Sequence, residues 1–301
     1  MTGGMPLLDL VIQGPHLSAA ALPARILALS RDMDAAHDGV IRIRGVSERA
    51  GVPAVESLQA AGLDAALVRP GMRLTDFKLL ASDLDSTLCA TETLDDIARK
   101  AGFGEAVAIV TEAAMRGEIK DYADSLRSRI RAIAGCPAAA FSECGRTLPY
   151  NPGSELLMAA FKAAGLKRYI VTGGFDEIAA AAAAHLKADG WRCNKIEVKA
   201  GRLTGVVTGP EENGFEIIGP EGKARMVSQL CKQHGASPEE VIAIGDGWND
   251  VKMLSFAGLG IAYHAKPRVR ALIRCQVNRL GLDSILNWFE DGPAWRRKAL
   301  S

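Results

Sequence analysis

The stretch Phe77-Lys78-Leu79-Leu80-Ala81-Ser82-Asp83-Leu84-Asp85-Ser86-Thr87 joins an apolar run to a pair of aspartates. The apolar half predicts a buried strand, and the ligands of open parallel sheets bind just beyond the carboxyl ends of such strands. Asp83 and Asp85 lie two residues apart, so both side chains leave the strand end on the same side. Two unpaired carboxylates about 4 Å apart repel each other by roughly 4 kcal/mol at an effective dielectric constant near 20. The motif therefore indicates a metal site, or a nucleophile beside a general acid, with an ordinary turn or helix cap as the alternative.

Three more polar clusters occupy comparable positions. The run Tyr169-Ile170-Val171 leads into Thr172-Gly173-Gly174, and Ile242-Ala243-Ile244-Gly245 leads into Asp246-Gly247-Trp248-Asn249-Asp250. Gly222-Lys223 opens an amphipathic segment that continues to Cys231. Each cluster taken alone is more commonly a turn, a solvated helix residue or a helix cap. Their shared position at strand ends and at one helix start predicts that they form a single site.

The motifs also stand in a distinctive order along the chain. They read D-L-D-S-T-L from Asp83, E-T-L-D-D-I-A from Glu92, M-R-G-E from Met115, S-L-R-S-R from Ser125, V-T-G-G-F from Val171 and G-D-G-W-N-D from Gly245. This ordered set resembles the haloacid dehalogenase superfamily, and within it is most similar to the phosphoserine phosphatase family, over residues 77–290. The resemblance implies an α/β fold whose Rossmann-like core is a parallel sheet with helices on both faces. It also implies a small helical cap at about residues 92–150.

The resemblance assigns the catalytic roles, and elementary chemistry agrees with them. Asp83 would attack phosphorus and form an aspartyl-phosphate, which is an established covalent strategy. Asp85 would protonate the leaving oxygen and later deprotonate the attacking water, and a neighbouring negative charge favours the protonated form that this role needs. Thr172 and the Gly173 amide would donate to phosphate oxygens. Lys223 would supply a compact positive charge to both the phosphate and the nucleophile.

An all-oxygen site that shares a substrate phosphate suits Mg²⁺. The resemblance gives the ligands as the Asp83 and Asp246 side chains and the Asp85 backbone carbonyl, with Asp250 holding a metal-bound water. The four aspartates and a phosphate dianion carry a formal charge of −6, against +3 from Mg²⁺ and Lys223. This imbalance supports a neutral Asp85 and makes the metal indispensable.

The segment between the first two motifs is predicted to be helical over Thr93–Lys100, Glu105–Met115 and Tyr122–Ile133, with a turn-rich exit through Pro149 and Pro152. The resemblance places Glu92 against a substrate ammonium and Arg129 against its carboxylate, and it places Asn249 at the substrate. Arg forms a bidentate fork with carboxylates, and Glu is a strong acceptor for ammonium. Without the resemblance, a helix-terminal charge and a solvated arginine would be the ordinary interpretations.

Two positions depart from the family pattern. Trp248 stands where the family usually has a small residue, and we expect its ring to pack on the core or to narrow the site. Thr172 replaces a more common Ser and keeps the hydroxyl group.

Residues 1–76 have their own pattern. Strands are expected at 7–13, 32–36, 39–46 and 64–68, with helices at 18–30 and 54–61. This βαββαβ order predicts a ferredoxin-type sandwich. It resembles a degenerate amino-acid-binding ACT domain, with a structural or dimerising role as the alternative. Residues 291–301 are expected to form a frayed basic tail.

Composition places the chain among ordinary globular proteins. It has 301 residues, 48% of them hydrophobic, and a net charge of +1, which gives no case for nucleic acid or an anionic membrane as a partner. Six cysteines lack C-x-x-C spacing, and no stretch approaches 18 apolar residues. These features are typical of the reducing cytoplasm, and they are compatible with a homodimer.

Three hypotheses result. The first is a Mg²⁺-dependent phosphatase that converts O-phosphoserine to L-serine. The second is a phosphatase or phosphotransferase for another small phosphomonoester, such as phosphohomoserine, which Trp248 keeps open. The third is a non-catalytic amino-acid sensor, against which the intact set of Asp83, Asp85, Lys223 and Asp246 argues.

Overall fold

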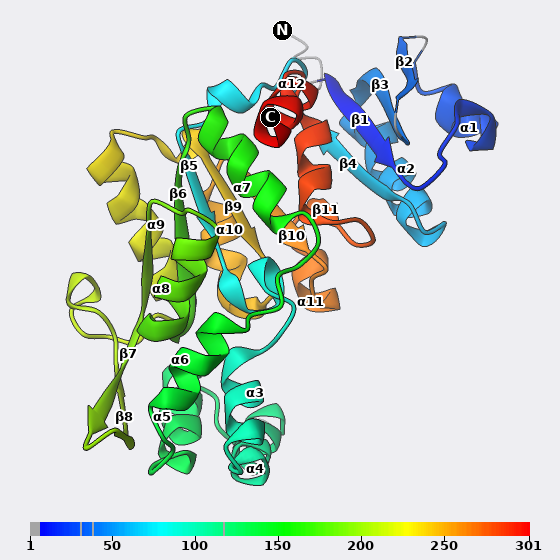
Figure 1. The fold of residues 1–301 in the computed structure, drawn as a ribbon. Coiled ribbons are helices and arrows are strands. Elements are labelled where there is room, and N and C mark those ends of the chain that lie inside the picture. The colour runs from blue at the N-terminus through cyan, green and yellow to red at the C-terminus, as the bar shows by residue number, and fades with distance from the viewer. Residues whose placement is uncertain (1–6, 31, 38, 117) are drawn as a thin grey trace, which may run out of the picture.

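The computed structural model describes residues 7–30, 32–37, 39–116 and 118–301, and Gly117 of the M-R-G-E motif lies outside them. The described part of the chain forms a four-stranded sheet followed by a seven-stranded sheet (Figure 1). None of the helices in these ranges is both long and apolar enough to cross a lipid bilayer.

The first sheet is antiparallel and has the strand order β2-β3-β1-β4. This is the order of a ferredoxin-type βαββαβ unit, so the expected topology is confirmed. Its elements are β1 (Leu7–Gln13), α1 (Ala24–Leu27), β2 (Met33–His37), β3 (Val40–Ser47), α2 (Glu48–Ala60) and β4 (Asp64–Val68). The helix expected at 18–30 is wrong in extent, because only a 3₁₀ turn at Ala19–Ala21 and the one-turn α1 form there. Pro23 separates them, since it lacks an N–H group and disfavours helix at the preceding residue.

The second sheet has the order β11-β10-β9-β5-β6-β7-β8, and all its pairs are parallel except β7–β8. The strands are β5 (Leu79–Ser82), β6 (Lys167–Phe175), β7 (Gly190–Lys199), β8 (Arg202–Thr208), β9 (Val241–Gly245), β10 (Leu259–Tyr263) and β11 (Cys275–Val277). β5 is central, with β6 on one side and β9 on the other, so their three carboxyl ends meet at one edge.

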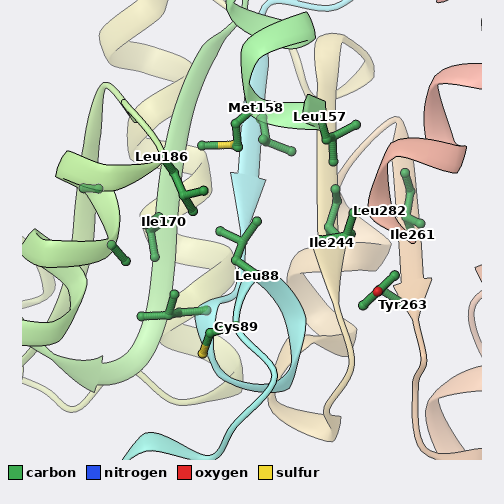
Figure 2. Close-up of a cluster of buried hydrophobic side chains, with 14 of the residues drawn as sticks. Leu88, Cys89, Leu157, Met158, Ile170, Leu186, Ile244, Ile261, Tyr263 and Leu282 are labelled. Carbon is green, nitrogen blue, oxygen red and sulfur yellow. The ribbon is translucent and has the colours of Figure 1, made fainter. Parts of the chain in front are cut away.

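Helices cover both faces of this sheet, because the central strands are apolar on both sides. Leu80 of β5 faces a cluster with Leu157 and Met158 of α7, and Leu79 faces Met226 of α9 on the other face. Figure 2 shows the first of these clusters, in which Ile170 and Ile244 from neighbouring strands meet the helix side chains. The covering helices are α7 (Ser154–Ala163), α8 (Asp176–His185), α9 (Pro220–His234), α10 (Val251–Phe256), α11 (Pro267–Arg270) and α12 (Gly292–Leu300).

A bundle of four helices is inserted between β5 and α7 and projects beyond the sheet (Figure 1). The helices are α3 (Thr93–Lys100), α4 (Gly104–Met115), α5 (Tyr122–Ala132) and α6 (Ala139–Arg146). The first three match the expected helices closely and the exit through Pro149 and Pro152 is irregular as expected, whereas α6, which precedes that exit, was not predicted. The hairpin of β7 and β8 also supports the cap, because Leu203 exchanges backbone hydrogen bonds with Gly135 and Cys136 at the end of α5.

The C-terminal segment is not a frayed tail, so that expectation was wrong. Residues 292–300 form α12, which packs against α7. Trp295 Nε1 donates to Asp291 Oδ2 at 3.0 Å, and Arg296 pairs with Asp283. The sequence did not reveal this helix, because one tryptophan beside basic residues is too short a pattern to distinguish a packed C-terminal helix from a frayed terminus.

Two buried charges join the first domain to the core. Asp64 is 1% exposed and accepts hydrogen bonds from three consecutive backbone N–H groups, those of residues 278–280, at 2.7 to 3.1 Å. Arg42 pairs with Asp9 at 3.1 Å and donates to the carbonyl oxygens of Asn287 and Trp288. The domains are therefore connected by satisfied polar groups as well as by apolar packing.

The contact at Asp64 predicts a large stability effect. Asp64→Ala would leave three partly buried N–H donors without their charged acceptor, which should lower the free energy of unfolding by about 2–4 kcal/mol. Urea unfolding followed by circular dichroism measures this change. Glu56→Ala, at an exposed position of α2, should stay within about 0.5 kcal/mol of the wild type. Equal unfolding midpoints for Asp64→Ala and Glu56→Ala would contradict the assignment.

Candidate active site

The candidate site lies at the shared edge formed by the carboxyl ends of β5, β6 and β9. A cavity of about 370 Å³ opens there between the sheet and the helical cap. All but two of the site residues expected from the sequence line it. The lining residues are Asp83, Asp85, Glu92, Leu94, Asp95, Thr111, Tyr122, Leu126, Arg129, Thr172, Gly173, Gly174, Phe175, Asp246, Gly247, Asn249 and Lys266. The two exceptions, Lys223 and Asp250, are completely buried behind the cavity wall.

Lys223 contacts both Asp83 and Asp250 from the buried side of the cavity wall. Its Nζ lies 2.7 Å from Asp83 Oδ1 and 2.6 Å from Asp250 Oδ1. Asp250 Oδ2 accepts from the backbone N–H groups of Asp246 and Gly247 at 3.1 and 2.9 Å. A Cβ atom on Gly245 would come within 2.6 Å of the Asp250 carboxyl group, so glycine at the end of β9 allows that close approach. Both oxygens of Asp250 are thus occupied by the protein itself.

Asp83, Asp246 and Asp250 can each place one carboxylate oxygen within 4.8 Å of the others. Asp83 Oδ1 also accepts from the Leu84 amide at 2.7 Å, and Asp246 Oδ1 accepts from Thr87 Oγ1 at 3.4 Å. Within the described ranges, Oδ2 of Asp83 and Oδ2 of Asp246 have no hydrogen-bond donor. Two free carboxylate oxygens in a buried acidic cluster form a donor set that fits a hard divalent cation.

The charges in this cluster are not balanced by the protein. Burial raises the pKa of Asp83, the charge of Asp250 raises it further, and Lys223 opposes both effects. Burial and the charge of Asp250 raise the pKa of Asp246 to about 7. Burial alone would lower the pKa of Lys223, but the charges of Asp250 and Asp83 outweigh it and raise that pKa. A bound cation would supply the missing positive charge.

Asp85 lies apart from this cluster and has a different environment. Its Oδ1 accepts from the Thr93 amide at 3.2 Å, at the start of the cap helix α3. Burial, followed by the charge of Glu92, raises the pKa of Asp85 to about 6. The sequence analysis attributed a neutral Asp85 to neighbouring charge, whereas burial is the larger cause. Ser86 follows with φ of 54°, in a single tight turn that reverses the chain after β5.

Thr172–Gly174 form an irregular segment of β6, where the pairing with β7 shifts in register, and a residue that the sequence analysis missed holds this segment in place. Asn194 of β7 donates from Nδ2 to the Gly173 carbonyl at 2.8 Å and accepts from the Ile218 amide at 2.8 Å. Thr172 is fully buried, and its hydroxyl accepts from the Gly174 amide at 2.9 Å. Hydrogen bonds within the protein therefore fix the backbone of this segment without a ligand.

Tyr122 of the cap packs closely over the Thr172–Gly174 segment. A Cβ atom on Gly173 would lie 2.2 Å from the Tyr122 hydroxyl oxygen, and one on Gly219 would lie 2.9 Å from its ring. The two glycines thus allow the first residue of α5 to close against the core. Tyr122 was predicted only as the start of a helix, because a single aromatic residue there has no distinguishing pattern.

Glu92 and Arg129 both reach the cavity from the cap, as expected. Glu92 Oε1 accepts a hydrogen bond from the Ser86 hydroxyl at 3.0 Å. Arg129 Nη1 lies 4.0 Å from Asp95 Oδ1. Glu92 and Asp95 are therefore acidic groups and Arg129 a basic group on the cap side of the cavity, which thus offers a pair of opposite charges. Such a pair is complementary to the two charges of an amino acid.

The expectation for Trp248 was wrong. Its side chain is 49% exposed and is not among the residues that line the cavity. Arg268 lies 4.4 Å from the centre of its ring, a cation–π contact on the outer surface. Asn249, by contrast, lines the cavity as expected. The bulky residue therefore neither packs on the core nor narrows the site.

Asp95, Thr111 and Lys266 also line the cavity, and the sequence analysis gave them no role. Asp95 belongs to the E-T-L-D-D-I-A motif and could have been singled out there. Thr111 and Lys266 lie in no motif that we distinguished.

Comparisons with known proteins agree with this geometry. Residues 80–255 match the model of the haloacid dehalogenase-like hydrolase family. The chain is 44% identical to a phosphoserine phosphatase from Polaromonas sp. over 226 residues, which are 75% of this chain and 95% of the relative.

Two solved structures resemble the fold over almost the whole chain. A haloacid dehalogenase-family hydrolase from Salmonella enterica serovar Typhi has a TM-score of 0.83 at 26% identity, covering 95% of this chain and 99% of its own. The unliganded structure of a probable phosphoserine phosphatase from Vibrio cholerae has a TM-score of 0.78 at 31% identity, covering 99% and 91%. The chain therefore belongs to the haloacid dehalogenase-like hydrolases, within the group formed by the phosphoserine phosphatases.

Proposed function

We propose that this enzyme hydrolyses O-phospho-L-serine to L-serine and phosphate, the last step of L-serine biosynthesis, with Mg²⁺ and through an aspartyl-phosphate on Asp83. One observation supports this proposal above the others. A single cavity is lined from the core by Asp83 and Asp246 of the acidic cluster and by Thr172–Gly174, and from the cap by Glu92 and Arg129. The phosphate group of O-phosphoserine matches the core side of this cavity, and its ammonium and carboxylate groups match Glu92 and Arg129.

In the first half-reaction, an Asp83 oxygen attacks phosphorus while the bond to the serine oxygen breaks. Lys223 orients Asp83 through its contact at 2.7 Å, and the Thr172 hydroxyl and Gly173 amide bind the equatorial phosphate oxygens. Asp85 gives its proton to the leaving serine oxygen, and its raised pKa keeps that proton available. The Asp83 and Asp246 side chains and the Asp85 carbonyl would hold Mg²⁺, with Asp250 holding a water beside it, and the ion would supply positive charge against the phosphate.

In the second half-reaction, Asp85 accepts a proton from the water that attacks phosphorus. Asp83 leaves as a free carboxylate, and phosphate is released. Tyr122 and the other cap residues exclude bulk water, which would otherwise weaken the electrostatic contacts with the phosphate.

The alternatives now have less support. A phosphohomoserine phosphatase or phosphotransferase rested on Trp248, which lies outside the cavity. A non-catalytic sensor conflicts with the close contacts among Asp83, Lys223 and Asp250. Binding of an amino acid by residues 1–76 stays a prediction.

Metal removal gives the most direct test of the proposal. Phosphate release from L-phosphoserine should fall to background after EDTA treatment and dialysis, and should return when Mg²⁺ is added, because the acidic cluster lacks a counter-charge. Phosphothreonine, phosphohomoserine and p-nitrophenyl phosphate are measured in parallel. A higher kcat/KM for phosphohomoserine, or full activity without metal, would contradict the proposal.

Loss of the nucleophile should abolish the reaction. Asp83→Asn should lower kcat on L-phosphoserine at least about a thousand-fold and prevent labelling by radioactive phosphate in acid-quenched samples. Asp124→Asn, at an exposed site on the cap, serves as the control and should keep wild-type turnover. Near-normal turnover of Asp83→Asn would exclude Asp83 as the nucleophile.

The amino-acid end can be tested separately from the phosphate end. Arg129→Ala should raise KM for L-phosphoserine about 100-fold and leave p-nitrophenyl phosphate turnover largely unchanged, because only the amino acid has a carboxylate to lose. Arg127→Ala is the matched control, since Arg127 lies on the same helix and pairs at the surface with Asp124. An equal loss on both substrates would refute the selectivity role.

A further inference from the structure

Two polar atoms on the cap side of the cavity have no hydrogen-bond partner in the fold. Among the described residues, Thr111 Oγ1 and Arg129 Nε are both buried and unpaired, and both residues line the cavity. Buried polar groups in native proteins are almost always paired, so an unpaired one needs an explanation. Both residues line the cavity from the cap, so a ligand group bound there can pair with these atoms once the side chains turn toward it.

The position of Thr111 indicates which part of the ligand it meets. Thr111 lies on α4 and Arg129 on α5, and these two helices pack against each other. The acceptors Glu92 and Asp95 also line this end, and they are sufficient for an ammonium group. A carboxylate has only acceptor oxygens, and of the charged residues that the cap contributes to the lining, only Arg129 is a donor.

We propose that the Thr111 hydroxyl donates a hydrogen bond to the substrate α-carboxylate beside Arg129, and so is a second specificity-determining residue. This inference rests on the proposed hydrolysis of phosphoserine. In a helix, Thr has two accessible χ1 rotamers that exchange the positions of its hydroxyl and methyl groups. Rotation can therefore turn the hydroxyl into the cavity without breaking any hydrogen bond within the protein.

A role in binding and a role in folding predict opposite effects on stability. Valine has the shape of threonine without the hydroxyl, and that hydroxyl makes no hydrogen bond in the fold. Thr111→Val should therefore keep or raise the Tm, since it removes an unpaired buried group. A hydroxyl retained for folding would give a lower Tm.

The experiment compares Thr111→Val, Thr111→Ser and the wild type on L-phosphoserine, phosphoethanolamine and p-nitrophenyl phosphate. Thr111→Val should raise KM for L-phosphoserine about 10- to 100-fold, as expected for a lost hydrogen bond to a charged group, with kcat little changed. KM for phosphoethanolamine, which has the ammonium group but no carboxylate, should not change. Thr111→Ser should restore KM for L-phosphoserine, because it keeps the hydroxyl.

The control is Thr147→Val at the exposed end of α6, where the hydroxyl bonds only to backbone carbonyls outside the cavity. It should leave every KM unchanged. An unchanged KM of Thr111→Val for L-phosphoserine, an equal rise for phosphoethanolamine, or failure of Thr111→Ser to restore binding would each overturn the inference while leaving the proposed function intact. A wild-type enzyme that does not hydrolyse L-phosphoserine would instead overturn the proposed function, and this inference with it.

Discussion

The structure depends on the buried contact of Lys223 with Asp83 and Asp250. Desolvating these charges is costly, and their mutual attraction repays that cost only if the geometry is well satisfied. Here the ammonium group lies 2.7 and 2.6 Å from its two partners, and the second oxygen of Asp250 accepts from two backbone amides. The lysine fixes one oxygen of Asp83 and leaves the other free. The cluster therefore keeps a surplus of negative charge beside a defined nucleophile, which is the arrangement that a cation and a phosphate together can complete.

In the proposed function, the parallel sheet supplies the phosphate end of the site, and the cap supplies the amino-acid end. The carboxyl ends of β5, β6 and β9 meet because β5 pairs with both neighbours, so residues 83, 172 and 246 converge although they are far apart in sequence. The cap reaches the same cavity through α3, α4 and α5. Its connection to the sheet passes through Asp85, whose carboxylate accepts from the first amide of α3. The proposed general acid is therefore linked to the cap by this hydrogen bond.

Much of this site could be predicted from the sequence, because its motifs consist of short segments whose strand-end positions follow from hydrophobic runs. The pattern for α3 gave its bounds as observed, Thr93–Lys100, since its apolar residues recur with a clear helical period. α6 was missed because its eight residues, AAFSECGR, form only about two turns, in which Phe141, Cys144 and Gly145 alone are buried. Asn194 and Thr111 were missed for another reason. Their importance arises from which partners they meet or lack in three dimensions, and a single Asn in a strand or Thr in a helix is unremarkable in sequence.

The first domain contributes no residue to the cavity among those described, yet it is joined to the segments that frame it. Asp64 binds the amides of residues 278–280, and His264 in turn donates its amide to the Val277 carbonyl while its ring contacts the Leu280 carbonyl. Two residues further on, the Lys266 amide donates to the Asp246 carbonyl at 3.3 Å. A continuous series of hydrogen bonds thus runs from β4 of the ferredoxin-type domain to Asp246 of the acidic cluster. Such continuity supports the position of Asp246 mechanically, whereas regulation through this path would additionally require a second state of the domain that changes these contacts.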